Sequence, residues 1–221
     1  MPNPEPFIHR KNARARSVSI SLASDGTVVV TTPPRFPARL LPMYVSQASE
    51  WIEEHRTKLQ SKPQLLTNTS VFVFGKEYEI KVGDSFDGTV KLGTANITLN
   101  PVSPGSAHAR LLLEKWLITQ AREYVLTRVG VLAKKMGVTF ADVRFKQQKT
   151  RWGSCSSDKN LNFNWKLIHA PKEVIDYVII HELAHTEHMN HGTRFWEFVA
   201  KFDPDHPLHR GWLKRYGSTE D

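Results

Sequence analysis

The chain has 221 residues, of which 40% are hydrophobic, and a formal net charge of +8 with an isoelectric point near 9.6. Its single cysteine, Cys155, excludes an intramolecular disulfide and any metal site made only of cysteines. No segment approaches the roughly 18 apolar residues of a membrane span, and residues 1–10 lack the apolar core of a secretory signal, so we expect a cytoplasmic protein with no membrane partner.

The first hundred residues favour β-structure with one helix. Apolar side chains alternate over residues 18–30 around the turn sequence Asp25-Gly26, which predicts a β-hairpin. Apolar residues at helical spacing then predict a helix over residues 39–60. Further strands are expected at residues 71–74, 78–82, 89–92 and 97–99.

Proline and glycine residues interrupt both patterns at residues 101–106, and we place a domain boundary there. This gives a β-rich N-terminal domain over 1–105 and a second domain over 106–221. The second domain is expected to contain a helix over 107–136 closed by Gly137, strands at 138–145 and 161–165, and a helix over 172–188.

The most informative motif is His-Glu-Leu-Ala-His at residues 181–185. Histidines four residues apart on a helix share one face, about 6 Å apart along its axis, so His181 and His185 can bind one metal ion. Glu182 lies beside them and can take a proton from bound water whose pKa the ion lowers. Because imidazole nitrogen suits Zn²⁺, this HExxH motif predicts a catalytic zinc site, and a pair of ordinary helix histidines is the alternative.

A catalytic zinc needs a third protein ligand. His188 is too distant, because it lies about 10.5 Å along a straight helix from the first ligand. His191 is favoured over Glu197, since Asn190 and Gly192 tolerate the left-handed backbone that ends a helix and turns the chain back. The other candidates in this region are Glu187, His206 and His209.

Basic residues are spread along the chain, with small clusters at residues 10–16 and 144–151. A solvated surface is the favoured explanation, and contact with a nucleotide or a nucleic acid is the alternative. No nucleic-acid-binding motif of known type is present.

Several motifs of the second half follow one another in a fixed order. They are Arg151 to Cys155 (RWGSC), Asn164 to Ile168 with Ala170-Pro171, Asp176-Tyr177-Val178, residues 181–185, Asn190-His191 and Phe195-Trp196. Together these motifs resemble the YgjP-like metal-dependent hydrolases, a group that looks related to the SprT-like and WLM zinc metallopeptidases. The resemblance is dense over the second half and extends to the first half only in its β-rich character.

The resemblance implies an α+β fold, in which the β-rich N-terminal region precedes a zincin-like catalytic core of helices and sheet with the HExxH motif on a helix. It implies His181, His185 and His191 as ligands of Zn²⁺ and Glu182 as the general base. It also places residues 144–150 on a sheet edge that can pair with an extended peptide substrate.

Arg151 has two interpretations. Its guanidinium can stabilise a developing oxyanion or bind a phosphate or carboxylate near the metal, which would make Arg151 a catalytic residue. Alternatively, residues 151–154 form a turn that braces the sheet. Cys155 lacks support as a nucleophile, because nothing near it in the sequence predicts a lowered thiol pKa.

A zinc-dependent metallopeptidase is the favoured function, with a peptide or protein as substrate. A zinc-dependent phosphohydrolase acting on nucleoside triphosphates or phosphate esters is the alternative. A binding module with structural zinc fits less well, because it would leave Glu182 without a role.

Overall fold

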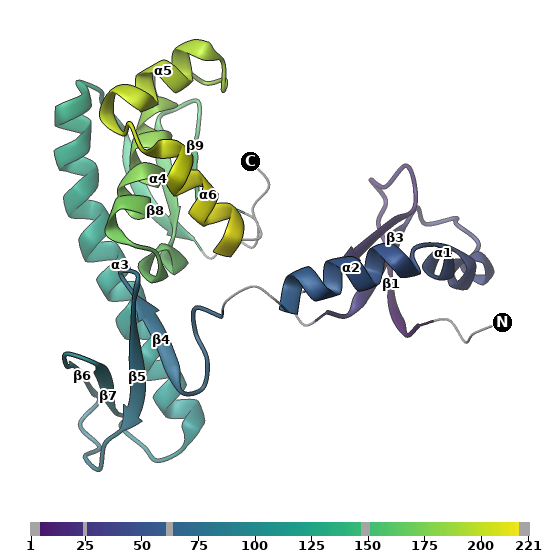
Figure 1. Ribbon diagram of the computed structural model, residues 1–221, viewed down its shortest axis with the longest axis horizontal. Coiled ribbons are helices and arrows are strands. Elements are labelled where there is room, and N and C mark those ends of the chain that lie inside the picture. The colour runs from purple at the N-terminus through teal and green to yellow at the C-terminus, as the bar shows by residue number, and fades with distance from the viewer. Residues whose placement is uncertain (1–4, 24–25, 61–63, 147–150, 217–221) are drawn as a thin grey trace. The chain divides into compact units, whose positions relative to one another are not determined.

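The computed structural model describes residues 5–23, 26–60, 64–146 and 151–216. Helices and three small sheets form a mixed α+β structure (Figure 1), as predicted. The chain divides into two compact units, Met1–Pro63 and Gln64–Asp221. None of the helices in the described ranges is long and apolar enough to cross a membrane.

The first unit is a three-stranded sheet with helices after it. Its elements are β1 (Phe7–Lys11), β2 (Ser19–Leu22), β3 (Val28–Thr32), the 3₁₀ helix η1 (Ala38–Leu40), α1 (Leu41–Gln47) and α2 (Ser49–Gln60). The predicted hairpin is present as the antiparallel pair β2 and β3, although Asp25 of its turn lies outside the described residues. The predicted helix over 39–60 is instead interrupted at Ala48, and β1, which pairs parallel with β3, was not predicted.

The second unit begins with a four-stranded sheet in the order β4-β5-β7-β6. Its strands are β4 (Ser70–Val73), β5 (Lys76–Val82), β6 (Thr89–Leu92) and β7 (Asn96–Asn100), close to their predicted positions. A tight turn joins β4 to β5, with Phe74 and Gly75 at positive φ.

The long helix α3 (Ser106–Met136) ends at Gly137, which has the left-handed conformation expected after a helix. Its N-terminal half packs with the four-stranded sheet around Leu113 and Leu117, and its C-terminal half packs with later elements around Val125 and Val129. Figure 1 shows the sheet along one part of α3 and the later helices beside the other. The chain therefore divides near Pro63 and not at residues 101–106, because the sheet shares its core with α3.

A second sheet of this unit, in the order β8-β10-β9, leads into the remaining helices. These elements are β8 (Asp142–Lys146), β9 (Gly153–Cys155), β10 (Asn160–Asn164), the 3₁₀ helix η2 (Trp165–His169), α4 (Lys172–Ala184), α5 (Thr193–Phe202) and α6 (His206–Tyr216). The strand predicted over 138–145 begins only at Asp142, and β9 was not predicted as a strand. Of the expected substrate edge over 144–150, residues 147–150 lie outside the described residues.

Candidate metal centre

Helix α4 carries the first part of the HExxH motif. Pro171 precedes its first residue, and a run of buried apolar side chains that includes Val178 and Ile179 holds the helix in the core. His181 and Glu182 lie in its last turn, and His185 is the C-cap residue. The helix predicted to reach His188 thus ends earlier.

The end of α4 is stabilised locally. The carbonyl oxygen of Leu183 accepts a hydrogen bond of 2.7 Å from the hydroxyl of Thr186 and one of 3.1 Å from the backbone N–H of the same residue. The chain turns after this point and brings His191 back to the motif, as predicted from the sequence. The predicted turn lay a few residues later, because the helix was expected to continue to His188.

The imidazoles of His181, His185 and His191 converge through their Nε2 atoms. Nε2 of His181 lies 3.2 Å from Nε2 of His185 and 3.0 Å from Nε2 of His191. A Zn²⁺ ion bound tetrahedrally at about 2.0–2.1 Å would set its ligand nitrogens about 3.3 Å apart. The donor atoms and their spacing therefore fit a divalent metal of the zinc type.

The other candidate ligands lie elsewhere. Within the described ranges, the three histidines are the group of potential ligand side chains close enough to hold one ion, and neither His188 nor Glu197 belongs to it. The ring of His188 packs against Phe198, with ring centroids 5.6 Å apart, and Glu197 is exposed on α5.

The protonation of two of these histidines suits metal binding, which requires neutral imidazole. Nδ1–H of His185 donates to the carbonyl oxygen of His188 at 3.1 Å, and because a carbonyl only accepts, the neutral ring carries its lone pair on Nε2, where a metal would bind. Burial first, and then repulsion from its two histidine neighbours and Arg210, lower the pKa of His181 to about 3. His181 is therefore neutral at physiological pH.

Two aromatic residues of α5 support the cluster. Phe195 is fully buried, and its ring centroid lies 4.9 Å from that of His181, 4.6 Å from His185 and 4.8 Å from His191. Trp196 stacks on His191, with centroids 5.7 Å apart and an interplanar angle of 22°. Phe195 therefore belongs to the core, whereas Trp196 is only half-buried and contacts a candidate ligand.

Glu182 is 5% exposed and lies against the backbone of β9. A Cβ atom placed on Gly153 would lie 2.6 Å from Oε1 of Glu182 and 2.8 Å from its Cγ. Glycine at this position is therefore what allows the carboxylate its present place. The glycine within RWGSC is the only sign of this close approach in the sequence. The contact between Gly153 and Glu182 itself depends on how β9 packs on α4.

A cavity of about 250 Å³ joins these groups. Its lining consists of Arg151, Gly153, Ser154, Cys155, His181, Glu182, His185, Met189 and His191. Each site residue expected from the sequence thus borders one space, with Arg151 exposed at the surface. Burial and then the charge of Glu182 raise the pKa of Cys155 to about 11, which agrees with the sequence argument against a nucleophilic thiolate.

Comparison with known proteins gives one family match over most of the chain. The model of the YgjP-like, metallopeptidase domain family matches residues 16–216. No curated protein matches the chain significantly.

Two solved structures are similar to part of the chain. The metallopeptidase zymogen jannalysin of Methanocaldococcus jannaschii is 20% identical, with a TM-score of 0.37 over 41% of this chain and 93% of that one. The metallopeptidase zymogen abylysin of Pyrococcus abyssi is 22% identical, with a TM-score of 0.38 over 43% of this chain and 99% of that one.

Proposed function

The chain belongs to the YgjP-like family of metallopeptidase domains, and we propose that it hydrolyses peptide bonds with a zinc ion held by His181, His185 and His191. The observation that carries this proposal is the convergence of three Nε2 atoms beside a buried glutamate in one cavity. Three protein ligands leave a coordination position for water or substrate, as a catalytic zinc requires. When bound, the ion polarises the substrate carbonyl and lowers the pKa of water.

Glu182 is the general base in this proposal. Its carboxylate borders the same cavity as the three imidazoles, so it can accept a proton from the attacking water and pass it to the leaving amine. The close approach of β9 at Gly153 fixes the carboxylate in place, and burial keeps bulk water from competing for it.

Arg151 lies at the rim of the cavity, and we assign it to the substrate. A guanidinium there can donate hydrogen bonds to the oxygen on which negative charge develops during attack. The side-chain amide of Asn164 donates to the carbonyl oxygen of Arg151 at 3.1 Å, which anchors the backbone from which the guanidinium extends.

The peptide is proposed to bind along β9. In the sheet order β8-β10-β9 both β8 and β9 are edge strands, but Gly153, Ser154 and Cys155 of β9 line the cavity. An extended peptide can therefore add to β9 through main-chain hydrogen bonds and reach the three histidines. The expected edge over 144–150 is the other edge of this sheet, where its described residues 144–146 belong to β8.

Mass spectrometry of an unfolded protein substrate incubated with the zinc-loaded chain tests the proposal, with nucleoside triphosphates offered in parallel. We expect peptide fragments that disappear after chelation and return when zinc is restored, and intact triphosphates. Hydrolysis of triphosphates with intact protein would support the phosphohydrolase alternative instead. Fragments that still form after the metal has been removed would contradict the metal-dependent mechanism.

A further inference from the structure

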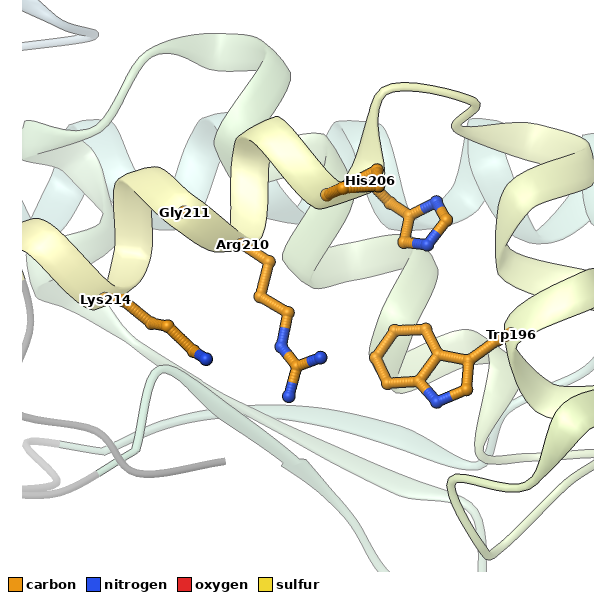
Figure 2. Close-up of a pocket in the computed structure, with 6 residues that line it drawn as sticks. Trp196, His206, Arg210, Gly211 and Lys214 are labelled. Carbon is orange, nitrogen blue, oxygen red and sulfur yellow. The ribbon is translucent and has the colours of Figure 1, made fainter.

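A second cavity, of about 420 Å³, lies between α5 and α6. Among the described residues, its lining consists of Trp196, His206, Pro207, Arg210, Gly211 and Lys214. Three of these residues are basic or can become so, and none is acidic. Figure 2 shows Arg210 and Lys214 extending from α6 on the same side, with the guanidinium of Arg210 between the ammonium of Lys214 and the indole of Trp196.

The basic residues of this cavity form one stripe of α6. His206, Arg210 and Lys214 follow one another at intervals of four residues, which places them on one helix face. The guanidinium carbon of Arg210 lies 5.0 Å from the ring centroid of Trp196, and His206 stacks on the same indole at 5.6 Å and 18°. An aromatic wall of this kind holds the planar guanidinium in a fixed orientation.

Trp196 connects this cavity to the candidate metal centre. Its ring centroid lies 5.7 Å from that of His191 and 5.9 Å from that of His181. One indole ring therefore separates the guanidinium of Arg210 from the histidine cluster. The charge of Arg210 is also among the influences that lower the pKa of His181, as expected for neighbouring groups.

We propose that the cavity formed by Trp196, His206, Arg210 and Lys214 is a substrate pocket that binds a carboxylate of the peptide near its scissile bond. The guanidinium of Arg210 has the planar fork that binds a carboxylate through two parallel hydrogen bonds, and Lys214 adds a second positive charge. This inference rests on the proposed peptidase function and gives that function a preference for acidic substrates.

The reach of a peptide agrees with this position. An extended chain advances about 3.3 Å per residue. Two or three residues between the scissile bond and a carboxylate are therefore long enough to pass the width of one indole. That carboxylate can belong to an aspartate or glutamate side chain or to the C-terminus of the substrate. Both sources present the same group to Arg210.

Equilibrium binding of peptides to a catalytically inactive variant tests the pocket independently of peptide hydrolysis. The ligands are fluorescein-labelled hexapeptide pools that differ only in having glutamate or glutamine, and a free or an amidated C-terminus. Each pool is titrated with zinc-loaded Glu182→Gln protein, and binding is measured by fluorescence anisotropy. Because hydrogen bonds between charged groups are stronger than those between neutral groups, we expect acidic or free-carboxylate pools to bind at least roughly tenfold more tightly than neutral, amidated pools. The pool that shows the gain identifies the source of the carboxylate.

The variants test which residues cause the preference. Arg210→Gln and Lys214→Gln should each reduce it, and Arg210→Lys should restore it only in part, because an ammonium lacks the planar fork. Arg215→Gln is the matched control, since it removes one charge from an exposed position of α6 outside the cavity lining and should leave the preference intact.

Equal affinity for all pools, or a preference that survives in Arg210→Gln and Lys214→Gln, would overturn the pocket. Displacement of the acidic peptides by inorganic triphosphate at lower concentration than by unlabelled acidic peptide would also overturn it in favour of a phosphate site. Selective binding by Glu182→Gln protein, together with no peptide cleavage by the wild type, would leave the pocket standing and refute the proposed function.

Discussion

The backbone carbonyl group of His188 contacts a residue of the candidate metal centre, whereas its side chain does not. The carbonyl oxygen accepts a hydrogen bond from His185, while the imidazole packs on Phe198 away from the cluster. His191, three residues later, directs Nε2 to the cluster. These two histidines therefore form a matched pair for mutation.

His191→Ala should weaken zinc binding by more than the roughly 10- to 100-fold that loss of a supporting hydrogen bond costs, because it removes a proposed ligand. His188→Ala keeps the backbone carbonyl and should leave zinc affinity nearly unchanged. Competition with a chromogenic chelator measures both. Equal zinc affinity in the two variants would remove His191 from the ligand set.

Gly153→Ala should reduce peptidase activity while zinc stays bound. The added methyl group would meet Glu182, so the carboxylate must move, and positioned general bases contribute about 10²- to 10⁴-fold to rate. Gly130→Ala is the control, because Gly130 has open space around its Cβ position on α3 and should only raise the free energy of unfolding by about 0.5–1 kcal/mol. Unchanged kcat in Gly153→Ala would show that the position of Glu182 is not limiting.

The three proposed ligands and Glu182 could be predicted from the sequence because their relations are mostly local. Helical spacing links His181 to His185, and a turn after the helix links both to His191. The roles of Gly153 and Arg210 could not be predicted, since each depends on a packed neighbour from another element.

At the scale of elements, η2 is tied to β4 by a buried histidine. His169 is 4% exposed, and its Nδ1–H donates to the carbonyl oxygen of Phe72 at 2.7 Å. Burial lowers the pKa of His169 below its ordinary value of 6.5, although the hydrogen bond opposes this. The ring is therefore neutral in the folded chain under conditions in which the unfolded chain begins to take up a proton.

The stability contributed by this neutral ring should be fully present above pH 6.5 and should be lost as the pH falls below that value, because the unfolded state then binds more protons than the folded state. One such group changes the free energy of unfolding by at most about 1.4 kcal/mol per pH unit. Urea unfolding of metal-free wild type and His169→Asn between pH 7.5 and 5 measures the effect.

His169→Asn keeps a donor for Phe72 and should show a shallower loss of stability on acidification than the wild type. His108→Asn, at an exposed position of α3, should retain the wild-type slope. Identical slopes in all three proteins would contradict a buried neutral His169.

Element boundaries followed from the sequence where a single residue sets them. Gly137 fixed the end of α3, and alternation located the strands of the four-stranded sheet. The end of α4 was missed because Thr186, rather than a glycine, satisfies the carbonyl of Leu183. The short strand β9 was missed because its three residues have too little alternation to predict pairing with β10.

At the scale of the whole molecule, the boundary between compact units lies near Pro63. The prediction near Gly105 relied on proline and glycine content, whereas the sheet of residues 70–100 is joined to α3 by buried side chains that include Val71, Ile97 and Leu117. The proline and glycine content of residues 101–106 therefore indicates a break between two elements, whereas the extent of the compact unit depends on contacts between residues far apart in the sequence.

A fragment of residues 64–221 should therefore fold and bind zinc with the affinity of the full chain, since it contains both of its own hydrophobic cores and all three proposed ligands. A fragment of residues 106–221, cut at the boundary predicted from sequence, should unfold because it loses the sheet that covers α3. Circular dichroism and zinc titration of both fragments check this. Stable folding of the shorter fragment would contradict the assignment of the units.

The most direct test of the proposed catalytic centre compares zinc-loaded wild type with Glu182→Gln, measuring bound metal and cleavage of an unfolded protein in the same samples. Glu182→Gln should keep its zinc, because the proposed ligands are histidines, and should lose about 10²- to 10⁴-fold in peptide hydrolysis, because the general base is gone. Undiminished cleavage by Glu182→Gln with zinc bound would contradict the assignment of this centre as the peptidase site.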